Sequence, residues 1–156
     1  MNKLRVAVIG TGMIANSAHF PALNILRKEG KVEVVGVADI RPEAAQETAK
    51  RHDVPNWYTD PQKMLDELHP DFVAVCTPNV HHKEWTIKAL KAGAHVACEK
   101  PIATSLADAR EMWQTAKECG KMLFPCQCMR WRNYMQQSKE LVSSGELGDV
   151  YFSDIE

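Results

Sequence analysis

The sequence predicts an α/β fold organised around a doubly wound parallel sheet. Short apolar runs rich in β-branched residues alternate along the chain with longer segments that can form helices. That order is typical of parallel strands joined by right-handed crossovers, with helices covering both faces of the sheet. The first apolar run, residues 4–9, leads directly into a glycine-rich turn at residues 10–15. A chain of 156 residues is long enough to bury one sizeable core.

Five clear strands are expected, and a short sixth segment is ambiguous. Trp57 and Tyr58 form either a connector or a brief edge strand, and Pro125 places the last strand of the set near a sheet edge because proline donates no ladder hydrogen bond. Residues 150–155 alternate in polarity and resemble the start of another strand. The five clear strands cover residues 4–9, 32–38, 71–76, 94–98 and 122–126.

Helices are expected between these strands, with recognisable starts and stops. Pro21 predicts a break near residues 19–20 and a restart at the proline. Side-chain caps are expected from Thr59 or Asp60, from Asn79, and from Thr104 or Ser105. The predicted helices cover residues 16–29, 42–50, 61–68, 79–92, 105–118 and 132–144.

Composition argues against several classes of protein. A net charge of −1 gives no basic field for nucleic acid, and 45% hydrophobic with 25% charged residues is the profile of a soluble globular domain. No apolar run reaches the ~20 residues that span a bilayer. Residues 1–3 lead straight into the first strand, which leaves no room for a signal peptide. We therefore expect a cytoplasmic protein with no nucleic-acid or membrane partner.

The cysteines and histidines show no recognised metal-binding or disulfide pattern. Five cysteines are present, an odd number, and no C-x-x-C pair occurs. The adjacent His81 and His82 do not share a helix face. Cys126 and Cys128 alternate on a segment expected to be extended, so a redox pair remains an alternative. We expect reduced thiols and no metal site.

The turn at residues 10–15 has the pattern G-x-G-x-x-A, one form of the dinucleotide-binding fingerprint. Gly10 permits a tight turn out of the strand, and Gly12 lets a pyrophosphate approach the backbone. Ala15 is small enough for the following helix to pack on the strand, and the N-terminus of that helix favours phosphate. The motif therefore predicts dinucleotide binding.

An acidic residue follows the second strand where a ribose-binding carboxylate is expected. Asp39 lies about 24 residues after Ala15, close to the ~20 of the fingerprint. Its carboxylate would accept hydrogen bonds from the ribose hydroxyls and repel a 2′-phosphate. Arg41 is a possible phosphate partner. The pattern favours NAD over NADP.

Other polar residues follow the predicted strands. Because ligands bind parallel sheets at the carboxyl ends of the strands, residues 77–79 and the pair Glu99–Lys100 should lie near the glycine turn and Asp39.

These segments resemble the N-terminal half of the Gfo/Idh/MocA oxidoreductases. The resemblance covers nearly all of the chain, and its most specific part is E-K-P after a strand with T-P-N-x-x-H upstream. The matching segments are residues 10–15, 77–82, 92–101, 130–132 and 145–148. The family implies a Rossmann fold and an NAD(P)-dependent dehydrogenase acting on a sugar, polyol or related hydroxyl compound.

The resemblance also implies roles for individual residues. Lys100 would be catalytic, handling the proton on the substrate oxygen, and would also lie at the cofactor. Glu99 would contact the nicotinamide-side ribose, and Trp131 with Arg132 would help to hold the nicotinamide. A cis peptide bond is expected between Lys100 and Pro101. The remaining expected cofactor residues are Gly10, Thr11, Gly12, Met13, Ile14, Asp39, Thr77, Pro78, Asn79 and His82.

The chain departs from the family in length. Family members are about twice as long, so we expect a Rossmann domain over residues 1–148 and, at 149–156, the start of a C-terminal α/β substrate domain that is absent from this chain. The fragment alone should be inactive, and the full-length protein should be a homo-oligomer. Two alternatives stay open: a non-catalytic dinucleotide-binding sensor or partner module, and a related domain that binds another nucleotide.

Overall fold

The computed structural model describes residues 3–151, which fall into two compact units. The first ends at Cys126 and the second begins at Gln127. The predicted domain boundary at residue 148 stays a prediction. No helix of the described residues is long and apolar enough to cross a membrane.

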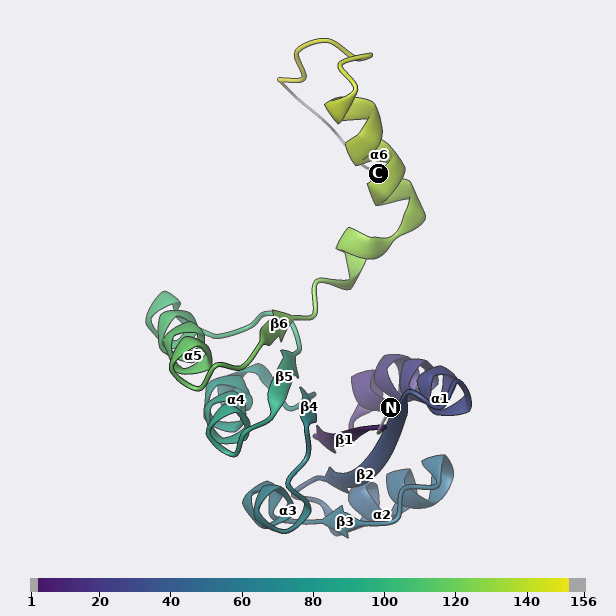
Figure 1. The fold of residues 1–156 in the computed structure, drawn as a ribbon, viewed down its shortest axis with the longest axis vertical. Coiled ribbons are helices and arrows are strands. Elements are labelled where there is room, and N and C mark those ends of the chain that lie inside the picture. Colours follow the sequence, from purple (N-terminus) through teal and green to yellow (C-terminus); the bar gives the residue numbers. More distant parts are fainter. Residues whose placement is uncertain (1–2, 152–156) are drawn as a thin grey trace. The chain divides into compact units, whose positions relative to one another are not determined.

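The first unit is built on one six-stranded sheet in which every strand pair is parallel. The order β3-β2-β1-β4-β5-β6 confirms the doubly wound prediction (Figure 1). The strand containing Pro125 forms one edge of the sheet, as expected, and the other edge is the brief strand at Trp57 and Tyr58, which decides between the two alternatives left for these residues. The strands are β1 (Leu4–Ile9), β2 (Val32–Ala38), β3 (Trp57–Tyr58), β4 (Phe72–Val75), β5 (His95–Cys98) and β6 (Leu123–Pro125).

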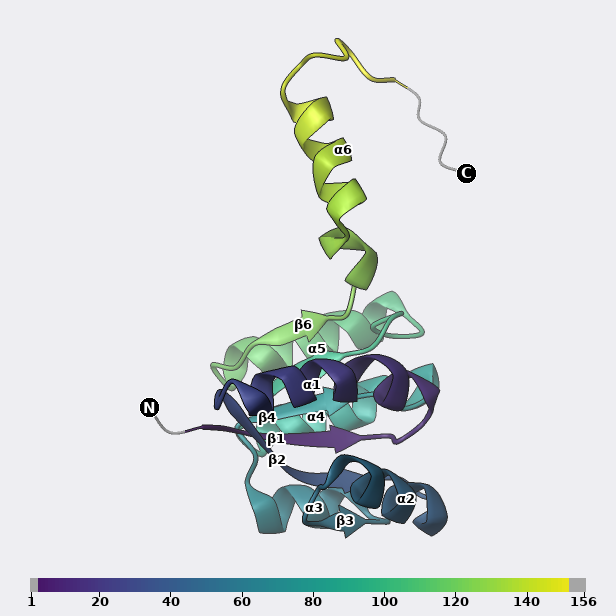
Figure 2. The ribbon, with the colours of Figure 1, turned by 90° about the vertical axis from the view of Figure 1, so that its right-hand side faces the viewer.

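Helices cover both faces of this sheet (Figures 1 and 2). On one face lie the π-helical turn η1 (Ala15–His19), α1 (Phe20–Lys28) and α2 (Pro42–His52). On the other lie α3 (Pro61–Leu68), α4 (His82–Lys91) and α5 (Leu106–Glu118). Alternate residues of β1 face the two layers, Val6 and Val8 toward α1 and α2, Ala7 and Ile9 toward α3, α4 and α5.

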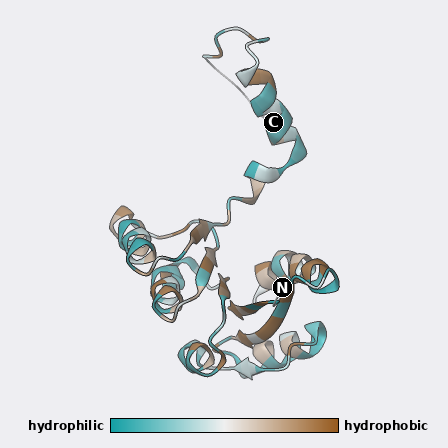
Figure 3. Cartoon of the chain, viewed as in Figure 1, coloured by the Kyte–Doolittle hydropathy of each residue, from teal (hydrophilic) through white to brown (hydrophobic). Residues whose placement is uncertain are grey.

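The two layers make two hydrophobic clusters, and the strands between them are the most apolar part of the fold (Figure 3). A glycine of β2 lies where a helix packs closely on the sheet. A Cβ at Gly36 of β2 would overlap the side chain of Leu68, so this glycine allows α3 to pack closely on the sheet.

Most of the predicted helix boundaries are found. At the break expected near residues 19–20 the backbone stays helical and changes from the π-helical η1 to α1. The predicted caps Asp60 and Ser105 accept hydrogen bonds from the backbone N–H groups of Gln62 and Asp108. The prediction that Asn79 caps a helix is wrong. Asn79 instead begins the 3-10 turn η2 (Asn79–His81), and His81 is the N-cap of α4 without a side-chain cap bond.

The second unit contains the 3-10 turn η3 (Cys128–Trp131) and α6 (Asn133–Ser143), neither of which has a buried residue. Because Cys128 begins a helical turn, the expected extended alternation with Cys126 is wrong, and no disulfide joins the five cysteines, all of which are described. The strand expected at 150–155 lies largely outside the described residues.

Candidate functional site

A cleft of about 570 Å³ lies at the carboxyl end of β1, the central strand. Its walls come from the glycine turn, the end of β2, the segment after β4 and the first turns of α4. β1 lies between β2 and β4, whose connections lead to opposite faces, so the cleft is at the topological switch point of the sheet. The lining includes Gly10, Gly12, Met13, Ile14, Asp39, Arg41, Thr77, Pro78, His81, Glu84 and Trp85.

The two glycines of the turn have different surroundings. Gly10 has φ of +89°, and a Cβ there would lie 2.7 Å from the backbone carbonyl carbon of Cys76. Gly12 has no atom within 4 Å of the place a Cβ would occupy. Gly10 is therefore required by the fold itself, whereas the space at Gly12 is open to a ligand. Ala15 is fully buried against the sheet.

Asp39 is buried and its carboxylate is held by four hydrogen bonds. The backbone N–H and hydroxyl of Thr11 donate to Oδ2 at 2.9 and 3.0 Å. The backbone N–H and Nε of Arg41 donate to Oδ1 at 3.0 and 3.2 Å. Burial alone would raise the pKa of Asp39, but these bonds outweigh it and leave the pKa below its usual value. The carboxylate is therefore anionic and fixed in orientation at the rim of the cleft.

A second hollow of about 550 Å³ adjoins the first across the glycine turn. It shares Gly12, Met13 and Arg41 with the main cleft and adds Thr11 and residues of α2, including Glu47 and Arg51. Arg41 therefore reaches both spaces with an exposed side chain.

The segment after β4 contributes unevenly. Thr77 and Pro78 line the cleft, and the buried hydroxyl of Thr77 has no hydrogen-bond partner. Asn79 is exposed and is not part of this lining. His82 is fully buried, with Nδ1 2.8 Å from the carbonyl oxygen of Pro101 and Nε2 2.9 Å from that of Thr77. In this structure His82 supports the segments around the cleft from behind.

Glu99 and Lys100 follow β5 and lie at the carboxyl ends of the strands, as the cleft does. Glu99 is buried, and its Oε2 accepts a hydrogen bond from the backbone N–H of Lys100 at 3.1 Å. Its Oε1 lies 2.8 Å from Nε2 of His19. The Lys100 side chain is exposed, and the predicted cis bond between Lys100 and Pro101 is confirmed.

Trp131 and Arg132 belong to the second unit and are exposed, so their contact with a cofactor stays a prediction. Sequence reasoning missed the contribution of α4, whose first turns place Glu84 and Trp85 at the cleft together with His81. The available signal was that these residues lie at the start of the helix expected after the strand at residues 71–76.

The residues of the first unit match a family model. An oxidoreductase family model with an NAD-binding Rossmann fold matches residues 4–126. D-Glucoside 3-dehydrogenase of Escherichia coli is 41% identical over 148 residues, which are 95% of this chain and 41% of that protein. Myo-inositol 2-dehydrogenase of Thermotoga maritima is 30% identical over 145 residues, 93% of this chain and 42% of that protein.

A solved structure agrees with these sequence matches. The WlbA dehydrogenase of Bordetella pertussis, in complex with NADH and UDP-GlcNAcA, has a TM-score of 0.88 and 29% identity, covering 96% of this chain and 44% of that one. The chain spans about two fifths of the length of these relatives. With its parallel sheet, glycine turn and family match, the chain belongs to the Gfo/Idh/MocA oxidoreductase family and contains its NAD-binding Rossmann domain.

Proposed function

We propose that this chain is the cofactor-binding part of a dehydrogenase that transfers a hydride between NAD and a sugar, polyol or related hydroxyl compound. The observation that carries the proposal is the open space at Gly12 beside the fixed carboxylate of Asp39, at the switch point of the sheet. Relatives named as a glucoside dehydrogenase and an inositol dehydrogenase support the substrate class.

The residues of the cleft fit a dinucleotide. Gly12 and the turn around Thr11, Met13 and Ile14 offer backbone to a pyrophosphate, because no side chain fills the space at Gly12. The unpartnered hydroxyl of Thr77 gives the ligand a further hydrogen-bonding group. When bound, NAD supplies the hydride acceptor of the reaction.

The adenosine ribose is assigned to Asp39, whose anionic form accepts a hydrogen bond from a ribose hydroxyl. The same charge opposes a 2′-phosphate, which supports NAD over NADP.

Lys100 is proposed to hold the proton that leaves or joins the substrate oxygen. Its side chain is exposed at the carboxyl end of β5, the edge of the sheet where ligands bind. The bond from its backbone N–H to Glu99 holds the start of this segment.

The test is a binding titration of residues 1–156 with NADH, run beside an assay for NADH formation with a panel of polyols and sugars. We expect saturable NADH binding without robust turnover, because substrate positioning, which supplies about 7–11 kcal/mol of barrier lowering, needs a held substrate and a dry cleft. Absence of NADH binding would overturn the cofactor assignment. Turnover that disappears in Lys100→Ala would show instead that this part of the protein is catalytically sufficient.

A further inference from the structure

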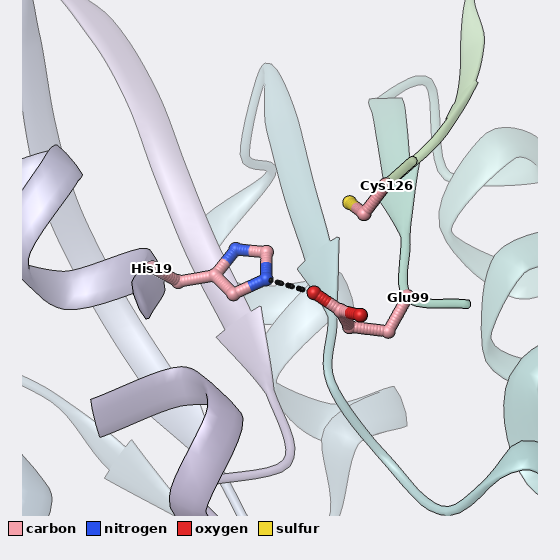
Figure 4. Close-up of side chains that lie close together, drawn as sticks. All are labelled: His19, Glu99 and Cys126. Atoms are coloured by element: carbon pink, nitrogen blue, oxygen red, sulfur yellow. Dashed lines mark hydrogen bonds and ion pairs between the residues drawn. The ribbon is translucent and has the colours of Figure 1, made fainter. Parts of the chain in front are cut away.

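Three side chains able to ligate a metal meet at the carboxyl edge of β5 and β6. His19, Glu99 and Cys126 come from segments far apart in the sequence, and their ligand atoms lie within 4.8 Å of one another. Figure 4 shows the imidazole, the carboxylate and the thiol directed toward a common space. All three belong to the first compact unit.

Backbone hydrogen bonds fix two of these three ligand residues, Glu99 and Cys126, at the ends of strands. The N–H of Glu99 donates to the carbonyl of Val75 at 3.0 Å, which extends the β4–β5 pairing by one residue. The N–H of Cys126 donates to the carbonyl of Cys98 at 2.8 Å, which does the same for β5 and β6. His19 is the last residue of η1, immediately before the buried Phe20. The cluster is therefore held by the sheet and by a packed helix start.

We propose that His19, Glu99 and Cys126 bind one Zn²⁺ ion, with solvent as the fourth ligand. An imidazole nitrogen, a thiolate and a carboxylate oxygen are the three ligand types zinc takes in proteins, and three protein ligands with one open position make a partly accessible tetrahedral site. Sequence spacing could not reveal it, because the three residues form no local motif.

The distance between the ligand atoms of His19 and Glu99 needs only a small adjustment to accept the ion. Two oxygen or nitrogen ligands of one tetrahedral zinc are about 3.3 Å apart, given bonds of about 2.0–2.1 Å. Nε2 of His19 and Oε1 of Glu99 are 2.8 Å apart, so they must separate by about half an ångström. The Glu99 side chain has rotatable bonds for this movement, and the Cys126 side chain can turn its sulfur toward the same point.

Charge and access agree with a cation at this place. Burying a carboxylate costs free energy unless a cation or a hydrogen-bond donor pairs with it, and His19 is such a partner for Glu99. A divalent ion would take over that role and would bind the thiolate of Cys126, whose proton leaves to solvent on binding. The side chains of His19 and Glu99 are 15% and 11% exposed, so an ion and a water ligand can reach them.

The test uses residues 1–156 without any cofactor, so its result does not depend on the proposed dehydrogenase function. Zn²⁺ alone is titrated calorimetrically, and Co²⁺ is added to a second sample to detect a thiolate-to-cobalt charge-transfer band. We expect one equivalent of metal and a clear band. Cys126→Ser should abolish the band. Cys126→Ser and His19→Gln should each weaken Zn²⁺ binding beyond the 10–100-fold loss typical of an outer-shell partner.

Cys128→Ser is the matched control, because Cys128 is exposed, is two residues away and lies in the second unit. It should keep both the band and the affinity. A measurement without mutation protects the test from misfolding of a variant: Zn²⁺ should slow alkylation of Cys126 but not of Cys128, read by peptide mass spectrometry. Absence of the band, unchanged binding by Cys126→Ser, or equal alkylation of Cys126 with and without Zn²⁺ would overturn the proposal.

Discussion

Thr11 donates two hydrogen bonds to a single oxygen of Asp39, one from its backbone N–H and one from its hydroxyl. This contact joins the glycine turn after β1 to the end of β2. The second oxygen of Asp39 accepts two bonds from Arg41, so all of the roughly four acceptor sites of the carboxylate are occupied. A ribose hydroxyl must therefore replace a donor, and the exposed Nε of Arg41 is the one that can leave.

This arrangement predicts opposite effects for two neighbouring substitutions. Asp39→Ala should weaken NADH binding and reduce the preference for NADH over NADPH, because the ribose acceptor and the repulsion of the 2′-phosphate both disappear. Arg41→Ala should widen the preference for NADH over NADPH, because it frees one acceptor site on Oδ1 of Asp39 and removes a cation that pairs with a 2′-phosphate. A charge-assisted bond is worth about 1.5–3 kcal/mol, so changes of roughly tenfold or more are expected.

Fluorescence titrations with NADH and NADPH measure the two dissociation constants for each variant. Arg51→Ala is the control, since Arg51 lines the second hollow but not the main cleft. Tighter NADPH binding in Arg41→Ala would contradict the assignment.

The pKa of Asp39 also predicts a pH dependence of stability. Because the folded-state pKa is lowered, the carboxylate contributes stability that is fully present above its unfolded pKa of about 3.9 and is lost as the pH falls through the folded value. Asp39→Asn cannot contribute in this way. We expect the gap in unfolding free energy between the two proteins to be largest near neutral pH and to shrink below about pH 4. Urea unfolding at a series of pH values measures it, and a gap independent of pH would rule this role out.

The two glycines of the turn should separate folding from binding. Gly10→Ala places a side chain at positive φ, which costs about 1–2 kcal/mol, and against the backbone of Cys76 and Thr77. It should lower the melting temperature markedly. Gly12→Ala meets no atom of the protein, so its melting temperature should stay close to that of the unmodified chain while NADH affinity falls. Thermal unfolding with and without NADH tests both, and full NADH binding by Gly12→Ala would contradict a pyrophosphate at this turn.

The sheet was predictable because its signals are local. β1 is a continuous apolar run followed by a glycine turn, and Asp60 and Ser105 cap helices through bonds within three residues. Asn79 is not a helix cap because the backbone N–H of His81 donates to the carbonyl of Pro78 and forms a 3-10 turn. The helix α4 therefore begins after this turn, at His82. Nothing in the residue types of that segment distinguishes the two outcomes.

Burial and distant contacts set the limit of prediction at the site. His82 is expected from the resemblance to line the cofactor cleft, yet packing buries it entirely. His19 and Glu99 are 80 residues apart, and only the assembled sheet brings them within hydrogen-bond distance. Asp39, by contrast, was placed correctly at the cleft because the end of a strand fixes its position without reference to other elements.

The position of His82 predicts a supporting role that a surface histidine would not have. Its ring lies between the carbonyl oxygens of Thr77 and Pro101, so it ties the segment after β4 to the segment that follows Lys100. A neutral imidazole donates to only one of these carbonyls at a time, so His82→Leu leaves one part-buried carbonyl without its donor, at a cost of about 1–3 kcal/mol. We expect a lower urea midpoint and weaker NADH binding, because Thr77 and Pro78 line the cleft.

The adjacent His81 provides the control, since it is exposed and has the same residue type. His81→Leu should change the unfolding free energy by no more than about 0.5 kcal/mol, as surface substitutions usually do. His82→Gln retains one amide donor and should recover part of the loss. If His82→Leu were as stable as His81→Leu, the two carbonyl contacts would contribute nothing, and the segments carrying Thr77 and Lys100 would have to be held by their strands alone.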